Sequence, residues 1–160
     1  GTLVAWRLAR HSARRALLTF AGAMLLLVTV GGMGHEVFGR QSSGVLLVPA
    51  VKAEMQRLGP NVPFYSVNLL DHTMPYYLGH TMIMVQHPDE LEFGVKQEPQ
   101  KWVPTLTDFY ARWRADPKAL ALVDPGTFGQ LEAQHLPMRI IARDSRRIVI
   151  SKPQPEDNVK

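Results

Sequence analysis

The chain of 160 residues contains no cysteine, and it also lacks the motifs that mark common cofactor sites. A disulfide framework and thiolate metal sites are therefore excluded, although the composition is compatible with an oxidising compartment. No phosphate-binding loop, dinucleotide-binding glycine pattern, nucleophile elbow or zinc-ligand spacing is present. The six histidines are scattered, and His72 and His80 beside Asp71 are poorly spaced for a metal site. The sequence therefore predicts no catalytic constellation of its own.

Acidic residues are absent from the first 15 positions, which hold four arginines. These are Arg7, Arg10, Arg14 and Arg15. From Ala16 onward the chain carries 14 basic and 14 acidic residues, so the formal net charge of +4 belongs to the N-terminal end. A nucleic-acid interface needs lysine and arginine clustered on the folded domain, and we therefore predict no nucleic-acid partner.

Charge is also absent from residues 16–34, a largely apolar run. A helix of this length, at about 1.5 Å per residue, approaches the roughly 30 Å of a bilayer's hydrocarbon core. We therefore predict a transmembrane helix at 16–34, in which Thr19 and Thr29 bond back to helix carbonyls. The arginines before the run place its N-terminal flank in the cytoplasm and everything after Gly34 in the bacterial periplasm, by the positive-inside rule.

A cleaved secretory signal peptide has a similar pattern, because glycines stand at the end of the run. The run is longer than the about 7 to 15 residues of a signal peptide's apolar region. Residues 3–6, which precede the arginines, resemble the end of an earlier span. We therefore predict that residues 1–15 form the end of a preceding span and a basic cytoplasmic loop. On this interpretation the chain is the last part of a longer polytopic membrane protein, and whether the run is retained or cleaved is left open.

The remaining residues predict a linker at 35–43, a periplasmic domain at 44–153 and a polar tail at 154–160. Apolar spacing and helix-terminating residues predict four helices, at 45–58, 73–78, 105–115 and 125–135. Short apolar runs predict strands at 62–67, 81–85 and 119–123, followed by a β-hairpin at 138–142 and 147–151. This order is typical of a small α/β layer domain with a partly parallel sheet and a C-terminal β-hairpin.

Two polar clusters, at 71–80 and 89–98, follow neighbouring predicted strands. The carboxyl ends of adjacent parallel strands lie at one edge of an open α/β sheet, where such sheets bind ligands. We therefore predict a substrate- or interdomain-facing edge. Its candidate residues are Asp71, Tyr76, Tyr77, His80, Glu90, Glu98 and Trp102. A structural role stays open, in which Asp71 only caps the next helix, and the proline-containing stretch 97–104 predicts a loop that packs against a membrane or a sister domain.

Several short segments in order resemble a known family. They are Phe64-Tyr65-Ser66-Val67, Asp71-x-Thr73-x-Pro75-x-Tyr77-Leu78-Gly79, Asp89-Glu90-Leu91-x-Phe93-Gly94, Gln97-Glu98-Pro99, and then Phe109 and Trp113. Together they resemble the C-terminal periplasmic region of bacterial aminoarabinose lipid A transferases and related sugar transferases. These enzymes belong to the protein mannosyltransferase-like, GT-C class of membrane glycosyltransferases, and the resemblance extends over about residues 46–153.

The resemblance implies an integral inner-membrane enzyme that transfers a sugar, 4-amino-4-deoxy-L-arabinose in the named family, from undecaprenyl phosphate to lipid A. A cationic sugar on lipid A would weaken the attraction of the outer membrane for polymyxin and other cationic peptides. The implied partners are the bilayer, the membrane domain of the longer protein and these two lipids. The family's acidic catalytic residues lie in early periplasmic loops and do not map onto this chain, whose implied role is support. A divalent metal in the longer protein stays open, because no ligands are identifiable here.

Two other function classes stay open at this point. One is a membrane-anchored periplasmic ligand-binding module, which a polar edge of a parallel sheet permits. The other is an assembly domain without enzymatic activity, which the lack of a catalytic constellation favours.

Overall fold

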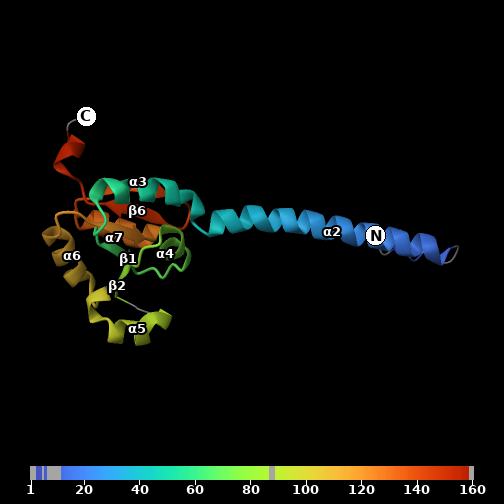
Figure 1. Ribbon diagram of the computed structural model, residues 1–160, viewed down its shortest axis with the longest axis horizontal. Coiled ribbons are helices and arrows are strands. Elements are labelled where there is room, and N and C mark those ends of the chain that lie inside the picture. Colours follow the sequence, from blue (N-terminus) through green and yellow to red (C-terminus); the bar gives the residue numbers. More distant parts are fainter. Residues whose placement is uncertain (1–2, 5, 7–11, 87–88, 159–160) are drawn as a thin grey trace. The chain divides into compact units, whose positions relative to one another are not determined.

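The structure is a computed structural model, and it describes residues 3–4, 6, 12–86 and 89–158 (Figure 1). The chain divides into two compact units, Gly1–Ser42 and Ser43–Lys160, and each is described by itself. Segment 1–15, which the sequence predicts to be the end of a span and a basic loop, lies largely outside the described residues.

The first unit contains α2 (Ala13–Ser42), a helix of 30 residues. Its part Ala13–His35 has a mean hydropathy of 2.0 and no buried residue, so it is long and apolar enough to cross a membrane. The hydroxyls of Thr19 and Thr29 donate to the carbonyls of Arg15 (2.9 Å) and Leu25 (2.8 Å), which satisfies the two polar side chains of the run within the helix.

The helix continues through most of the segment that the sequence predicts as a linker, 35–43. No proline interrupts residues 35–42, and the helix continues through Gly39 to Ser42. The backbone leaves the helical path at Gly44, whose φ of 68° lies in the left-handed region that glycine adopts without strain.

The second unit is built on a six-stranded sheet in the order β3-β2-β1-β4-β6-β5. Its strands are β1 (Phe64–Val67), β2 (Ile83–Val85), β3 (Trp102–Val103), β4 (Leu120–Val123), β5 (Arg139–Arg143) and β6 (Ile148–Ser151). The first four strands run parallel, whereas β6 pairs antiparallel with both β4 and β5. This mixed sheet with a C-terminal hairpin confirms the predicted α/β fold.

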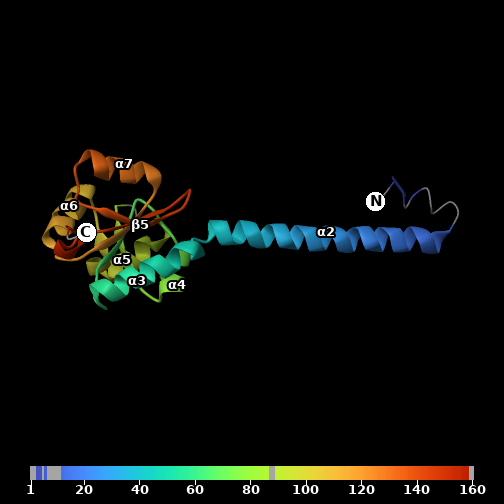
Figure 2. The ribbon, with the colours of Figure 1, turned by 90° about the horizontal axis from the view of Figure 1, so that it is seen from above.

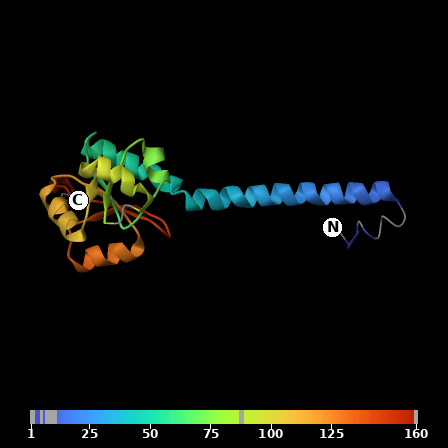
Figure 3. The same ribbon diagram turned by 90° about the horizontal axis from the view of Figure 1, so that it is seen from below.

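Helices cover both faces of the sheet (Figures 2 and 3). They are α3 (Val48–Leu58), α4 (Thr73–Leu78), α5 (Glu92–Gln97), α6 (Leu106–Ala115) and α7 (Pro125–Ala133). In both views α6 and α7 lie on one face, and α3, α4 and α5 lie on the other. Strands β1, β4 and β6 are buried along their whole length, which confirms that apolar runs without alternation mark strands covered on both faces.

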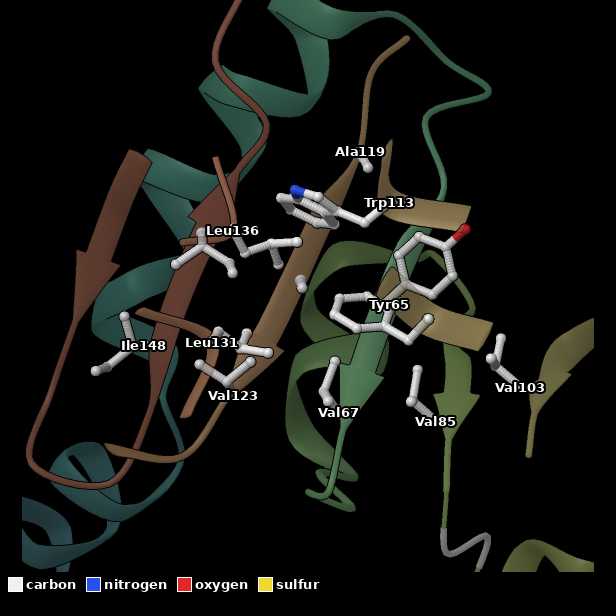
Figure 4. Close-up of a cluster of buried hydrophobic side chains, with 13 residues drawn as sticks. Tyr65, Val67, Val85, Val103, Trp113, Ala119, Val123, Leu131, Leu136 and Ile148 are labelled. Atoms are coloured by element: carbon white, nitrogen blue, oxygen red, sulfur yellow. The ribbon is translucent and has the colours of Figure 1, made fainter. Parts of the chain in front are cut away.

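Alternate residues of β1 enter two different cores. Tyr65 and Val67 join Phe109 and Trp113 in the core beneath α6 and α7, as Figure 4 shows for the labelled members of this cluster. Phe64 instead packs in the core beneath α3 and α4. The sheet is therefore the middle layer of three, as its side-chain period of two requires.

The stretch 97–104 differs from the predicted loop. It contains the last residue of α5, a 3₁₀ turn (Pro99–Lys101) and β3. Another 3₁₀ turn (Asp89–Leu91) precedes α5. Strand β3 has only two residues, which is too short for a periodic pattern. In addition, the predicted helix 45–58 begins as a 3₁₀ turn, Val45–Leu47, before α3 starts with Pro49 in its first turn.

A buried carboxylate, Glu54 on α3, joins elements at the amino ends of the parallel strands. Its Oε1 accepts hydrogen bonds from Arg57 (2.8 Å), Arg139 (2.9 Å) and Ser151 (2.7 Å), and its Oε2 accepts one from Arg57 (3.0 Å). Burial alone would raise the pKa of Glu54, but the hydrogen bonds from Arg57 and Ser151 and the charge of Arg139 lower it to about 2. Asp157 lies 3.5 Å from both Arg57 and Arg139, so the C-terminal residues are attached to the same cluster.

Candidate functional site

The predicted edge lies where strands β1 and β2 end. Helix α4 follows β1 and α5 follows β2 on one face, whereas the connection to β4 passes through α6 on the other face. The chain leaves β1 toward β2 and β3 on one side, and the connection from β3 then returns across the sheet to β4 on the other side of β1. Ligands of open α/β sheets bind at such a position, outside the carboxyl ends of the strands.

Asp71 stands at this edge, and both oxygens of its carboxylate accept hydrogen bonds inside the domain. Oδ1 accepts hydrogen bonds from the backbone N–H groups of Thr73 (2.9 Å) and Met74 (2.8 Å), which caps α4. Oδ2 accepts a hydrogen bond of 2.5 Å from Nε of Arg147. Burial would raise the pKa of Asp71, but the bonds from Met74, Arg147 and Thr73 outweigh it and lower the pKa below its usual range. The capping role that the sequence left open is therefore present.

Arg147 connects this carboxylate to the place where the chain enters the domain. The side chains of Arg147 and Asp71 are 7% and 4% exposed, so the ion pair is buried. Arg147 also pairs with Asp144 at 3.3 Å, and its guanidinium passes 3.4 Å from the point where a Cβ on Gly44 would lie. The Thr73 hydroxyl lies 2.6 Å from the carbonyl oxygen of Ser43 and 2.8 Å from Asp71 Oδ1. The first residues of the second unit are thus fastened to α4 and to the β5–β6 turn.

A pocket of about 390 Å³ opens beside Asp71, between α4 and α5. Its walls come from the loop after β1, from α4, from the residues of and before β2, and from α5. They include Leu70, Pro75, Met82, Met84, Leu91 and Val95 among the apolar residues, and Ser66, Asp71, His72, Thr81, Glu98 and Lys101 among the polar ones. The volume falls within the range of small-molecule sites.

The polar side chains around the pocket bond to one another or to backbone groups. His72 pairs with Glu90 at 2.8 Å, and Lys101 lies 3.3 Å from Glu98 and 3.1 Å from the Thr81 hydroxyl. The Ser66 hydroxyl donates to the carbonyl of Leu69, and Asp71 is held by Arg147. The groups left facing the pocket are mainly methyl, methylene and thioether groups.

Only some of the predicted site residues lie at the pocket. Asp71 and Glu98 line the pocket, and Glu90 reaches it through His72. Tyr76 is 81% exposed and packs edge-on against Tyr77, with ring centroids 5.5 Å apart.

Trp102 and His80 lie outside the pocket's lining residues. The Trp102 indole N–H donates to the carbonyl of Gln86 (2.8 Å), so this tryptophan is attached to its own domain on β3. The His80 backbone N–H donates to the Pro75 carbonyl (3.3 Å) at the end of α4.

Sequence reasoning missed Arg147, which lies 76 positions from Asp71 in the chain and forms the buried ion pair. No local signal marks such a long-range pair. Among the side chains that the structure describes, no three of the His, Asp and Glu types gather closely enough to hold a metal ion. These observations give the edge a well-ordered shape and an apolar pocket.

The sequence profile of the aminoarabinose transferase C-terminal domain matches residues 47–152. The chain belongs to this family. The match begins in the first turn of the second unit and includes the whole sheet, Asp71, Arg147 and the pocket. It confirms the resemblance that the ordered short segments indicate.

Two crystal structures of ArnT from Cupriavidus metallidurans resemble the chain. The structure bound to undecaprenyl phosphate is 37% identical over 99% of this chain, with a TM-score of 0.77. The apo structure is 40% identical over 93% of the chain, with a TM-score of 0.75. The chain spans 28% and 27% of the length of these two ArnT chains, respectively. Among curated proteins, none matched the chain.

Proposed function

We propose that this chain is the C-terminal part of an inner-membrane glycosyltransferase that moves 4-amino-4-deoxy-L-arabinose from undecaprenyl phosphate to lipid A. The observation that carries the proposal is membership of the aminoarabinose transferase family over residues 47–152. The likeness to the ArnT structure with bound undecaprenyl phosphate supports it, because 99% of this chain, apolar helix included, enters that comparison.

The proposed arrangement keeps the boundaries that the sequence predicts. Residues 16–34 span the membrane, residues 1–15 are the end of a preceding span and a basic cytoplasmic loop, and the domain 44–153 lies in the periplasm. The helical stretch that ends at Ser42 joins the two, and 154–160 form a tail. The charge-free run within α2 and the arginines before it support this orientation.

In this proposal the domain supports the enzyme and does not perform the chemistry. The acid at the predicted edge, Asp71, is held by a cap and by Arg147, and its lowered pKa keeps it ionised near neutral pH, so it is poorly suited to act as a general acid. The edge formed by 71–80 and 89–98 would pack over the periplasmic mouth of the membrane domain. Transfer of a cationic sugar to lipid A would then reduce binding of polymyxin.

The test uses the longer gene that contains this chain, expressed in a bacterium whose own lipid A aminoarabinose transferase is deleted. The intact protein should add aminoarabinose to lipid A phosphates, as seen by mass spectrometry, and should raise polymyxin tolerance. Deletion of residues 44–160 should abolish both through loss of folding or assembly. The chain of 160 residues by itself should show no turnover.

Three results would contradict the proposal in different ways. If a well-expressed intact protein left lipid A unmodified, the proposed transfer reaction would be wrong. If the enzyme kept full activity after deletion of 44–160, the domain would have no supporting role. Complete loss of turnover in a folded Asp71→Asn protein that still binds both lipids would give Asp71 a direct chemical role.

A further inference from the structure

The segment that carries α5 is attached to the sheet at its base. Just before the segment, the Gln86 N–H donates to the carbonyl of Val103 (2.8 Å), and the Gln86 carbonyl accepts a hydrogen bond from the Trp102 indole (2.8 Å). The chain therefore leaves the sheet at Gln86 and returns to it at Trp102, beside the point where it left. Compact surface excursions whose two ends are held together in this way are frequently functional.

Between these ends, residues 89–98 bury very little apolar surface. Among the side chains described from 90 to 98, only Val95 is buried, and it belongs to neither of the two cores of the second unit. Leu91 and Phe93 are exposed. In Figure 1, α5 lies at the lower margin of the second unit. A segment with so few buried contacts opens at a lower free energy than the rest of its domain.

This segment forms one wall of the pocket between α4 and α5. Leu91 and Val95 line the pocket from the segment's side. The other walls include Met82 and Met84, which are themselves buried. Movement of residues 89–98 away from α4 would therefore turn a pocket of about 390 Å³ into an open apolar surface.

An ion pair joins the segment to the opposite wall. Glu90, in the turn before α5, lies 2.8 Å from His72 at the start of α4. Glu92, two positions later, instead pairs with Lys96 (2.6 Å) inside α5 itself. When the segment moves as a unit, the first pair must break and the second stays intact. The side chains of both pairs are about two-thirds exposed, so solvent screens the His72–Glu90 pair and lets it break and re-form readily.

We infer that residues 89–98 form a flap, which moves about its base at Gln86 and Trp102 and controls access to the pocket. In the structure the flap is closed, and the His72–Glu90 pair is its clasp. When the flap is open, the walls formed by Met82 and Met84 face solvent. The inference adds a moving part to the edge that the proposed function assigns to packing, but its evidence lies wholly within the second unit. It therefore does not depend on the transfer reaction.

The absence of cysteine from the chain allows a direct test of opening. Val95→Cys and Val123→Cys each place a single thiol at a buried position, on the flap and on β4 respectively. In the full chain in detergent micelles, a water-soluble disulfide reagent should modify the Val95→Cys protein at least about 100-fold faster. Low concentrations of urea should not change that rate, because local opening exposes little surface. Equal rates that both rise steeply with urea would mean that the flap opens only when the domain unfolds, which overturns the inference.

A matched pair of substitutions, each added to the Val95→Cys chain, tests the clasp. Glu90→Ala removes the pair across the pocket and should raise the rate of thiol modification about two- to five-fold. Glu92→Ala removes an equally exposed pair within the flap and should leave the rate unchanged, because opening does not break that pair. An unchanged rate in both variants, or the same increase in both, would overturn the assignment of His72 and Glu90 as the clasp.

Hydrogen exchange in the unmodified chain tests the flap without any substitution. The backbone amides of α5 should exchange at least about ten-fold faster than those of α7, because opening of the flap does not require unfolding of the domain. Mass spectrometry of the peptides that contain 92–97 and 125–133 measures both rates. Equal protection of the two helices would show that α5 is a fixed part of the domain, and the inference would be wrong.

Discussion

The two ends of the sheet use similar charged residues for different purposes. At the amino ends of the parallel strands, two arginines and a serine converge on the single carboxylate of Glu54. At the carboxyl ends, Arg147 is shared by Asp71 and Asp144, and His72 pairs with Glu90, beside a pocket of about 390 Å³. One arrangement joins α3, β5 and β6 into a unit, and the other gives shape to a surface.

The largest effect is expected from Arg147→Met. This change leaves the Asp71 carboxylate buried without its cation, and breaking such a pair from one side costs about 3 to 5 kcal/mol of unfolding free energy. Urea unfolding of the full chain in detergent micelles measures it. The double variant Asp71→Asn with Arg147→Met should recover part of the loss, whereas a double variant that is as unstable as the single one would show that the pairing is not the cause.

A smaller effect is expected from Glu54→Gln, and it should depend on pH. The pKa of Glu54 is about 2 in the folded chain against an ordinary value of 4.5, so its ionised form stabilises the fold above about pH 4.5. That contribution is lost as the pH falls from 4.5 to 2. At neutral pH the variant should lose about 1 to 3 kcal/mol through weakened hydrogen bonds to Arg57 and Arg139.

Unfolding free energies measured between pH 7 and pH 2 check the Glu54 prediction. The curves of the two proteins should approach one another at the acidic end. A constant separation over this whole range would mean that the cost of Glu54→Gln is steric and not electrostatic.

The smallest effect is expected from His72→Ala. His72 and Glu90 are both about two-thirds exposed, and solvent screens an ion pair at such positions. The unfolding free energy should change by less than about 0.5 kcal/mol. A loss as large as that of Glu54→Gln would show that the exposed His72–Glu90 pair stabilises the domain as strongly as the buried Glu54 cluster does.

The parts of the fold that the sequence predicts are those with a local signal. Strands β1, β4 and β6 are apolar runs, and α6 begins with the Thr105 hydroxyl accepting from the Asp108 N–H, as a helix start should. Strand β3 escapes prediction because its two residues owe their conformation to pairing with Met84 and Val85. Strand β3 therefore forms because β2 is beside it, and not because of its own two residues.

The position of the candidate edge was predictable from a sequence pattern. The hydrogen bonds and ion pairs of its carboxylates were not. The rule that polar residues after parallel strands share one edge locates Asp71 and Glu98 correctly beside one pocket. The rule says nothing about which carboxylates are already occupied. The partner of Asp71 comes from a hairpin turn 76 positions later, so only the three-dimensional arrangement shows that the acid is engaged.

The order of the strands along the chain has a consequence for biosynthesis. Strand β6 is made after β5 but lies between β4 and β5 in the sheet. While the chain is growing, β4 therefore has an unpaired apolar edge, and β5 has no neighbour in the sheet until β6 emerges. An open edge of this kind is a template for pairing with other chains. Between synthesis of Val123 and of Ile148, this edge of β4 therefore stays open to pairing with other chains.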